Sequence, residues 1–438
     1  MRVYKLFWEK DIETLEQKGI KDLQLDRLNN SLNRIASTSF YKNFYLEKGY
    51  NVKPIKNLEQ MRELPFMTKD DLRKSYPAGF VVIEKSKIVR LHSSSGTTGT
   101  PTVIYHTKND IDNWSNMLAR CLTMIGTTSE DIFQNMMSYG LFSGGLGLHY
   151  GAEKIGMLVI PISSGNTQRQ IKFMRDFKTT IIHITPSYAL HLAETLRCMN
   201  IFNELYLRIG LMGAEPYTEA TRKKIENLLN IDVFNSYGLS EMNGPGVAFE
   251  CQEKEGMHLW EDNFYLEVIN PSTGETLPDG EEGELVISAI NREAMPLLRY
   301  RTRDLAFVYP DKCRCGRTHR RISRIKGRTD DMFIIGGVNI FPSQIEHVLM
   351  KIPEVGTNYQ IILWTKGALD KLTVKIEVNS EFFAGDLKQL TNLRETISRK
   401  VKDEILVTPV IELVEHGSLP PSEGKAIRVL DMRPNKTN

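Results

Sequence analysis

Short apolar runs recur through the middle of the chain at intervals of roughly 25 residues, which is the spacing of strands joined by helices. The predicted strands are 132–137, 157–161, 180–184, 207–212 and 231–234. Segments 166–177 and 186–196 open on cap residues and carry apolar residues at helical spacing, so they predict helices between strands. This alternation predicts an α/β fold with a largely parallel sheet, whose ligands bind beyond the carboxyl ends of the strands.

The pattern changes after residue 260. Strands 264–269 and 284–290, separated by turn residues, predict a small β subdomain. From residue 332 onward strands alternate with helices again, which predicts a separate α+β domain. Its predicted strands are 332–335, 359–364, 372–378 and 410–414, and its predicted helices are 342–350 and 387–401. The polar join at 327–331 suits a hinge, so we expect a large domain over 1–329 and a smaller mobile domain over 330–438.

Residues 93–101 read SSSGTTGTP, a loop with six hydroxyl residues and two glycines. Glycines let successive backbone N–H groups converge on one anion, and hydroxyls add donors around it. The segment is not a Walker loop, because no Gly-Lys-Ser/Thr follows. Apolar alternation at 87–92 and 102–106 predicts a hairpin around the loop. A flexible linker is the alternative for such a composition. The candidate phosphate ligands are Ser93, Ser94, Ser95, Gly96, Thr97, Thr98 and Gly99.

Composition and charge narrow the class of partner. The chain has 438 residues, of which 41% are hydrophobic and 25% charged, as in ordinary globular proteins. Lysine plus arginine (56) nearly balances aspartate plus glutamate (54), which gives no reason to expect nucleic acid or an anionic membrane as partner. No apolar run approaches the length of a membrane span. We therefore expect a cytoplasmic protein that binds small molecules, with a homodimer as one option for its assembly.

Five cysteines in such a chain do not predict a disulfide scaffold. Cys313 and Cys315 share one turn, and Cys251 and His258 bracket another, which together supply three sulfurs and an imidazole suited to tetrahedral Zn²⁺. His319 is a rival ligand, and free thiols in loops are the alternative. Because no carboxylate base accompanies the set, we expect a structural metal. Two further cysteines, Cys121 and Cys198, lie on helical patterns and are expected in the core.

Six motifs in order carry a resemblance to a known family. They are 93-SSSGTTGTP-101, 213-GAEP-216, 236-SYGLSE-241, 300-YRTRD-304, 327-GRTDD-331 and 424-GK-425. This set resembles the adenylate-forming family of acyl-CoA ligases, luciferases and peptide-synthetase adenylation domains. Segments 139–147, 251–262 and 337–346 resemble its phenylacetate–CoA ligase branch. The similarity covers essentially the whole chain.

The resemblance implies a role for each motif. Loop 93–99 would bind the β- and γ-phosphates of ATP, and Glu241 would hold Mg²⁺, which prefers hard oxygen ligands. Lys425 would bridge the attacking carboxylate and the α-phosphate, Arg328 would approach the phosphates, and the C-terminal domain would swing about Asp330 to admit coenzyme A. The remaining nucleotide contacts are Tyr237 on the adenine, Asp304 on the ribose, and Gly213, Ala214, Glu215, Pro216, Ser236 and Gly238 in the flanking turns.

Two positions depart from the broader family in a way that is typical of the phenylacetate branch. Thr102 stands where many members have lysine, and Arg303 stands where many have glycine.

The residues for the acid substrate follow the first strand of the parallel unit. Small residues beside aromatics suit a flat ring, although ordinary core packing explains the same pattern. The candidates are Tyr139, Gly140, Phe142, Gly144 and Gly145.

The sequence therefore predicts an enzyme that joins phenylacetate, or a related aryl acid such as indole-3-acetate, to coenzyme A through an acyl-adenylate. ATP is expected to yield AMP and pyrophosphate. Two alternatives stay open. One is a synthetase of the same fold whose adenylate is the product, as in deazaflavin cofactor adenylation. The other is a nucleotide- and zinc-binding module without catalysis.

Overall fold

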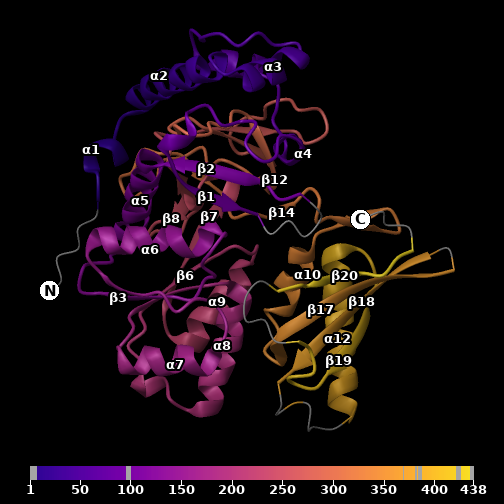
Figure 1. The fold of residues 1–438 in the computed structure, drawn as a ribbon. Coiled ribbons are helices and arrows are strands. Elements are labelled where there is room, and N and C mark those ends of the chain that lie inside the picture. The colour runs from indigo at the N-terminus through magenta and orange to yellow at the C-terminus, as the bar shows by residue number, and fades with distance from the viewer. Residues whose placement is uncertain are drawn as a thin grey trace. The chain divides into compact units, whose positions relative to one another are not determined.

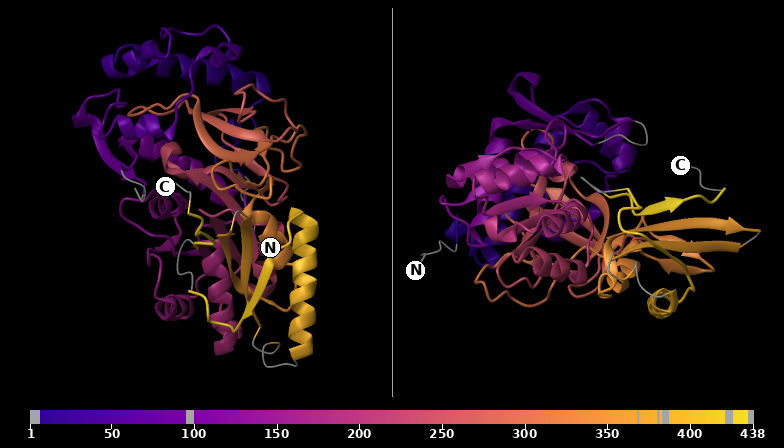
Figure 2. Two further views of the ribbon diagram at one scale, coloured as in Figure 1. Left: turned by 90° about the vertical axis from the view of Figure 1, so that its right-hand side faces the viewer. Right: turned by 90° about the horizontal axis from the view of Figure 1, so that it is seen from below.

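The computed structural model describes residues 7–94, 100–367, 369–379, 382, 387–420 and 426–434. These residues form two compact units, each assembled from two separate stretches of chain (Figures 1 and 2). Unit 1 comprises Met1–Ser163 and Phe234–Arg324, and unit 2 comprises Ser164–Val233 and Ile325–Asn438. The expected domain boundary after residue 329 falls shortly after the chain leaves unit 1 for the last time, and it stays a prediction.

Unit 1 holds the N-terminal helices and most of the strands. Its helices are α1 (Lys10–Glu13), α2 (Gln17–Ala36), α3 (Ser39–Glu47), α4 (Lys69–Lys74), α5 (Lys108–Thr123) and α6 (Ser143–Ile155), with the short turn η4 (Ser240–Met242). Its strands are β1 (Ile88–Ser93), β2 (Val103–Thr107), β3 (Ile132–Asn135), β4 (Leu158–Ile160), β7 (Asp232–Leu239), β8 (Gly244–Glu250), β9 (Met257–Leu259), β10 (Phe264–Ile269), β11 (Gly283–Ala289), β12 (Tyr300–Ala306) and β13 (Arg321–Ile322). The predicted hairpin around the glycine-rich loop is confirmed, since β1 pairs antiparallel with β2.

Helices α5 and α6 pack against each other and against β8 in the core of unit 1. A capping box starts α5: the Thr107 hydroxyl accepts from the Asp110 N–H, and the Asp110 carboxylate accepts from the Thr107 N–H. A Cβ on Gly151 of α6 would lie 2.6 Å from Leu118 Cβ, so the two helices approach closely at a glycine. Trp114 of α5 is fully buried and its indole N–H donates to Pro245 O at 3.1 Å.

The mixed α/β class is confirmed, and the prediction of a largely parallel sheet holds for part of it. Strands β3 and β4 pair in parallel in unit 1. Strands β7, β8, β9 and β13 instead pair antiparallel in that order. The physical reason is the connection between β7 and β8, which is the single turn η4, because a parallel pair would need a long crossover. Strands β10, β11 and β12 form an antiparallel meander, in which β10 and β11 match the two predicted strands and β12 was not predicted.

The N-terminal helices were not predicted, and they are fixed by polar contacts to distant segments. The buried amide of Gln24 on α2 donates to Glu261 O and Phe264 O at 2.9 and 3.1 Å. Ser31 on the same helix donates to Ile290 O at 3.2 Å. These contacts satisfy backbone carbonyls that α2 covers.

Unit 2 contains the predicted parallel pair β5 and β6 and the predicted C-terminal α+β fold. Its first segment contains α7 (Thr167–Asp176), β5 (Ile181–Ile184), α8 (Pro186–Met199), β6 (Ile209–Gly213) and α9 (Glu219–Leu229). Its second contains β14 (Gly327–Arg328), β15 (Phe333–Ile335), β16 (Val338–Ile340), α10 (Pro342–Leu349), β17 (Val355–Lys366), β18 (Leu369–Val378), α12 (Leu387–Ile405), β19 (Val410–Val414) and β20 (Val429–Asp431). The last sheet has the strand order β19-β18-β17-β20, and α12 lies along one face of it (Figure 2).

Polar contacts join the two segments of unit 2. The Glu346 carboxylate on α10 accepts from Thr218 N–H and from Tyr359 O–H, both at 3.0 Å. The Lys224 ammonium on α9 donates to Val355 O and Gly356 O at 2.8 Å. Burial lowers the pKa of this lysine to about 8.

The sequence predicted that Cys121 and Cys198 lie in the core and that no segment spans a membrane. Cys121 on α5 is buried as expected, but Cys198 is exposed, because it lies in the last turn of α8 beside exposed Met199. Within the described ranges, every helix is too short or too polar to cross a bilayer.

Candidate functional site

The base of the glycine-rich loop is closed by a reciprocal pair of hydrogen bonds. Ser94 N–H donates to Thr102 O at 3.0 Å, and Thr102 N–H donates to Ser94 Oγ at 3.1 Å. Ser93 N–H donates to Leu141 O at 2.9 Å, which ties the start of the loop to the predicted acid-binding segment. Five of the predicted phosphate ligands, namely Ser95, Gly96, Thr97, Thr98 and Gly99, lie outside the described residues.

The predicted adenine and ribose residues of unit 1 contact each other. Tyr237 on β7 donates its hydroxyl to Asp304 Oδ2 on β12 at 2.7 Å, and both side chains are buried. Gly238 follows Tyr237, and a Cβ there would lie 1.9 Å from Gly244 O, so only glycine fits. The preceding residue, Ser236, is buried, and its hydroxyl has no partner among the described residues. The close approach of Gly244 O therefore requires glycine at position 238. The hydroxyl of Ser236 remains available to donate a hydrogen bond to a ligand.

Arg303 adopts a backbone conformation that explains the glycine found there in many adenylate-forming enzymes. Its φ is +66°, in the left-handed region where glycine is preferred. Its N–H donates to Glu284 Oε1 at 3.1 Å on the neighbouring strand β11. At this position the chain therefore carries an arginine side chain on a backbone conformation that favours glycine.

Glu241, the predicted magnesium ligand, is 6% exposed in η4. Tyr300 donates its hydroxyl to Glu241 Oε1 at 3.2 Å, and Lys69 Nζ lies 3.9 Å from the same oxygen. No described residue donates to Oε2. A buried carboxylate with one oxygen available fits Mg²⁺, which takes few protein ligands and keeps several waters.

Arg292 holds the turn that carries Glu241. The guanidinium is 2% exposed and donates to Glu241 O at 2.7 Å and to Asn243 Oδ1. Asn243 has φ +79°, which ends η4 in the left-handed region. One arginine therefore contacts both the predicted metal-binding residue and the residue that ends its turn.

In unit 2, Glu215 connects the predicted adenine turn to the C-terminal segment. Ser187 Oγ donates to Glu215 Oε2 at 2.7 Å, and Ala426 N–H donates to Glu215 Oε1. Burial raises the pKa of Glu215, and these hydrogen bonds oppose the shift. Ala214 has φ +66°, between Gly213 at the end of β6 and the Glu215-Pro216 dipeptide.

Lys425 lies outside the described residues. It directly precedes Ala426 in the chain, and the Ala426 N–H is the group that contacts Glu215. The residue next to the predicted catalytic lysine is thus bonded to the predicted adenine turn.

The predicted hinge residue is paired with the predicted phosphate-binding arginine. Arg328 Nε donates to Asp330 Oδ1 at 2.9 Å, and a second guanidinium nitrogen donates to Oδ2 at 3.2 Å. Both side chains are about one-third exposed. Exposed ion pairs contribute little to the free energy of unfolding. Arg328 can therefore leave Asp330 for another partner without a large loss of stability.

The predicted acid-binding residues divide into two groups. Gly145 has a packing role, since a Cβ there would lie 2.6 Å from Ser138 O. The Tyr139 hydroxyl accepts from Asn135 Nδ2 at 2.8 Å and lies 3.1 Å from His149 Nδ1, so it is fixed within unit 1. Phe142 is 43% exposed, and Gly140 and Gly144 leave open or ordinary space where a side chain would be.

The four predicted zinc ligands are close together. The ligand atoms of Cys251, His258, Cys313 and Cys315 all lie within 4.8 Å of one another. Cys251 Sγ is 3.7 Å from Cys313 Sγ, and Cys315 Sγ is 3.2 Å from His258 Nε2. Hydrogen bonds from Cys251 and Cys313 lower the pKa of the Cys315 thiol.

The rival ligand His319 is engaged elsewhere. Its Nδ1 accepts from Glu261 N–H at 2.9 Å, and its Nε2 lies 3.0 Å from Ile12 O. Its backbone carbonyl faces His258 Nδ1 at 2.9 Å, which leaves His258 Nε2 for a metal. His319 therefore supports the cluster through its contact with His258 and is not itself one of the predicted ligands.

Four residues that contact the predicted site were not predicted from the sequence. They are Lys69, Ser187, Arg292 and Tyr300. Tyr300 and Ser187 carried a usable signal, since Tyr300 begins the YRTRD motif and Ser187 follows the strand at 181–184. Lys69 and Arg292 lie in segments without a distinctive pattern.

Comparisons with known proteins agree with this arrangement. Residues 51–291 match the AMP-binding enzyme family, and residues 337–433 match the AMP-binding enzyme C-terminal domain. Phenylacetate-coenzyme A ligase of Thermus thermophilus is 44% identical over 444 residues, covering 98% of this chain and 100% of the relative. The ligase of the same name from Escherichia coli is 42% identical, covering 96% of this chain and 97% of the relative.

A solved relative shares the fold across nearly the whole chain. The crystal structure of 2-hydroxyisobutyryl-CoA ligase in the postadenylation state with 2-HIB-AMP has a TM-score of 0.93 at 27% identity, covering 98% of this chain and 93% of the relative. The same enzyme with 2-HIB-AMP and CoA in the thioesterification state has a TM-score of 0.72, with the same coverage. With family match, sequence identity and fold in agreement, the chain belongs to the phenylacetate-CoA ligase family of AMP-binding, adenylate-forming enzymes.

Proposed function

We propose that the protein joins phenylacetate, or a closely related aryl acid, to coenzyme A in two steps. The acid first attacks the α-phosphorus of ATP, which gives an aryl-acyl adenylate and pyrophosphate. The coenzyme A thiol then attacks the acyl carbon, which gives the thioester and AMP. The observation that carries this proposal is the bond from Ala426 N–H to Glu215, which joins the turn next to Lys425 to the predicted adenine turn.

The nucleotide is held by residues of complementary chemistry. Asp304 accepts from the ribose hydroxyls, and Tyr237 stacks on the adenine, with their mutual hydrogen bond orienting both. The hydroxyls and backbone N–H groups of residues 93–99 surround the terminal phosphates. Adenylate-forming CoA ligases use ATP, coenzyme A and Mg²⁺. Glu241 is the residue here that would hold the cation, which supplies charge neutralisation to the phosphates.

Lys425 and Arg328 supply positive charge where negative charge builds up. In the adenylation step the carboxylate and the α-phosphate must approach each other, and a lysine between them offsets their repulsion. Arg328 exchanges its exposed pairing with Asp330 for a phosphate oxygen, at little cost to stability. Both residues lie after residue 324, so moving this segment removes them from the reaction centre.

The thioester step requires the C-terminal segment to move about Asp330. The two structures of 2-hydroxyisobutyryl-CoA ligase match this chain with different TM-scores, so that enzyme changes conformation between the steps. Rotation at 327–331 would break the Ala426–Glu215 bond and withdraw Lys425. This movement opens a channel for coenzyme A.

The acid lies along the segment 139–145. Phe142 offers an exposed aromatic face, and Gly140 and Gly144 leave room beside it. The fixed hydroxyl of Tyr139 and the packing of Gly145 keep this segment in place. An arylacetate matches these features, with phenylacetate as the simplest member.

Cys251, His258, Cys313 and Cys315 bind one structural Zn²⁺. Two thiolates on one tetrahedral zinc at bond lengths of about 2.3 Å lie about 3.8 Å apart. The Cys251–Cys313 distance of 3.7 Å supports this assignment. The carbonyl of His319 orients the His258 ring, as second-layer groups do around metals. Four protein ligands leave no position for a reactive water, so the ion stabilises the fold and takes no part in the reaction.

A panel of aryl acids tests the proposal. Purified protein is incubated with ATP, Mg²⁺, coenzyme A and one acid at a time, and AMP and the thioester are quantified by chromatography. We expect coenzyme A-dependent AMP release that is fastest for an arylacetate. AMP-linked acyl product that accumulates without coenzyme A dependence would favour the synthetase whose adenylate is the product. Nucleotide binding without turnover for any acid would favour the non-catalytic module.

A further inference from the structure

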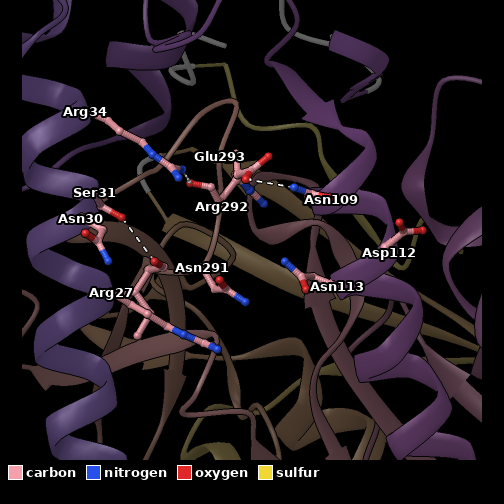
Figure 3. A pocket seen from close by; sticks show the side chains of 11 residues that line it. Arg27, Asn30, Ser31, Arg34, Asn109, Asp112, Asn113, Asn291, Arg292 and Glu293 are labelled. Atoms are coloured by element: carbon pink, nitrogen blue, oxygen red, sulfur yellow. Dashed lines mark hydrogen bonds between the residues drawn. The ribbon is translucent and has the colours of Figure 1, made fainter. Parts of the chain in front are cut away.

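A polar pocket of about 280 Å³ lies in unit 1 (Figure 3). Its walls come from α2, from α5 and from the segment 290–293 that precedes β12. Arginine and asparagine side chains predominate in its lining. The volume is that of several water molecules, since one water takes about 30 Å³ in the liquid.

Two of the arginines in this lining lack an acidic partner. Among the described residues, no carboxylate forms an ion pair with Arg292, and its Nε has no hydrogen-bond partner. Arg34 donates to Arg292 O at 3.3 Å and likewise pairs with no described carboxylate. Burial lowers the pKa of Arg292 to about 10. The acceptors of Arg292 are neutral oxygens, so its buried charge is not balanced by an ion pair, and an anion beside it would offset that cost.

Most other charged side chains of the pocket already form ion pairs or hydrogen bonds within the protein. Arg27 lies 3.7 Å from Asp262, whose carboxylate also binds Arg120. The Glu293 carboxylate accepts from Thr107 O–H and from Asn109 Nδ2, at 2.8 and 3.1 Å. Asp112 is the remaining acid of the lining. The groups left to receive a ligand are therefore mainly donors.

We propose that this pocket binds a small oxyanion, a phosphate or carboxylate group, between Arg34 and Arg292. The amides of Asn30, Asn113 and Asn291 line the same space and offer further donors (Figure 3). Guanidinium groups match the planar faces of carboxylate and phosphate oxygens, which favours this ligand class over a neutral one.

A ligand in the pocket would affect the predicted metal-binding turn through Arg292. The same guanidinium that lines the pocket donates to Glu241 O and Asn243 Oδ1. An anion that draws Arg292 toward the pocket weakens its hold on the turn. The concentration of Mg²⁺ that supports half-maximal activity should therefore rise when the pocket is filled.

Isothermal titration with inorganic phosphate tests binding, with the nucleotide site first saturated by a nonhydrolysable ATP analogue. The site variant is Arg34→Gln, and the matched control is Lys21→Gln, an exposed residue of the same helix α2. We expect one phosphate per chain in the parent and in Lys21→Gln, and at least tenfold weaker binding in Arg34→Gln. Acetate in place of phosphate identifies which of the two groups the site prefers, and binding of either supports the proposal.

Two results would overturn it. One is equal phosphate affinity in the parent and Arg34→Gln, which would assign the ion to another site. The other is absence of binding for both phosphate and acetate. Because binding is measured without the aryl acid and coenzyme A, this outcome is independent of whether the ligase reaction is correct. Unchanged melting temperature of Arg34→Gln shows that the variant is folded.

Discussion

The hydroxyl of Tyr237 donates a hydrogen bond of 2.7 Å to Asp304, across 67 residues of sequence. One residue is predicted to stack on adenine and the other to receive the ribose hydroxyls. Because a buried carboxylate is restrained by this bond, its lone pairs are directed before ATP arrives. The predicted nucleoside site is therefore preorganised by a pair of its own residues.

Removing this bond should weaken ATP binding more than it slows turnover. Tyr237→Phe keeps the aromatic face but loses the donor to Asp304. A hydrogen bond to a charged group contributes about 1.5–3 kcal/mol, so we expect kcat/KM for ATP to fall by at least about tenfold, mostly through KM. Steady-state kinetics with varied ATP measure this. Tyr265→Phe is the matched control, because it removes a tyrosine hydroxyl that lies 3.4 Å from Leu58 O. This variant should leave KM for ATP unchanged.

Lys425→Ala should separate the two half-reactions. Loss of a charge at the adenylation transition state should slow AMP-ester formation by about three orders of magnitude or more. Thioester formation from synthetic phenylacetyl adenylate and coenzyme A should remain near the parent rate. Lys400→Ala on α12 removes an exposed lysine of the same unit and should affect neither step. Equal loss in both half-reactions would contradict the assignment of Lys425 to adenylation alone.

A substitution at the predicted hinge should impair the thioester step, the opposite of the effect expected for Lys425→Ala. Asp330→Pro fixes φ near −65° and should impair the thioester step preferentially, while adenylation continues. Asp330→Ala is the matched control, because it removes the ion pair with Arg328 without restricting the backbone. Single-turnover assays of each step compare the two variants. If Asp330→Ala is as defective as Asp330→Pro, the carboxylate and not the rotation is what matters.

The cysteine cluster should contain zinc and contribute to stability. We expect near-stoichiometric zinc in the purified protein by elemental analysis and its loss from the Cys313→Ser/Cys315→Ser variant, with a lower melting temperature. Activity per folded molecule should change little. Cys198→Ser is the control, since that thiol is exposed on α8 and outside the cluster. Protein purified without chelators and found free of metal would contradict the assignment.

The elements predicted best from the sequence were those whose pattern is local. The runs at 181–184 and 209–212 are buried on all sides, so they appear as continuous apolar segments. The strands 244–250 and 257–259 were not predicted, because nearly all of their residues are buried, which leaves no alternation to detect. The helix pattern of 186–196 predicted α8, but the sequence did not predict that Cys198 in its last turn is exposed.

The site was predictable where a motif fixes local geometry and unpredictable where it depends on tertiary contacts. Gly238 can be predicted from its motif, and the structure explains it by the approach of Gly244 O. The bond from Tyr300 to Glu241 joins residues 59 apart, and no sequence pattern encodes that distance. The same holds for Arg292, whose role depends on three carbonyl and amide oxygens brought together by folding.

The most direct test of the central claim follows the oxygen atoms of the acid. Phenylacetate labelled with ¹⁸O in its carboxylate is turned over with ATP, Mg²⁺ and coenzyme A, and the products are examined by mass spectrometry. If the carboxylate attacks the α-phosphorus, one ¹⁸O atom appears in AMP and none in pyrophosphate. Label in inorganic phosphate together with ADP would contradict the account, because it would mean that the acid attacks the γ-phosphorus and that no acyl-adenylate is formed.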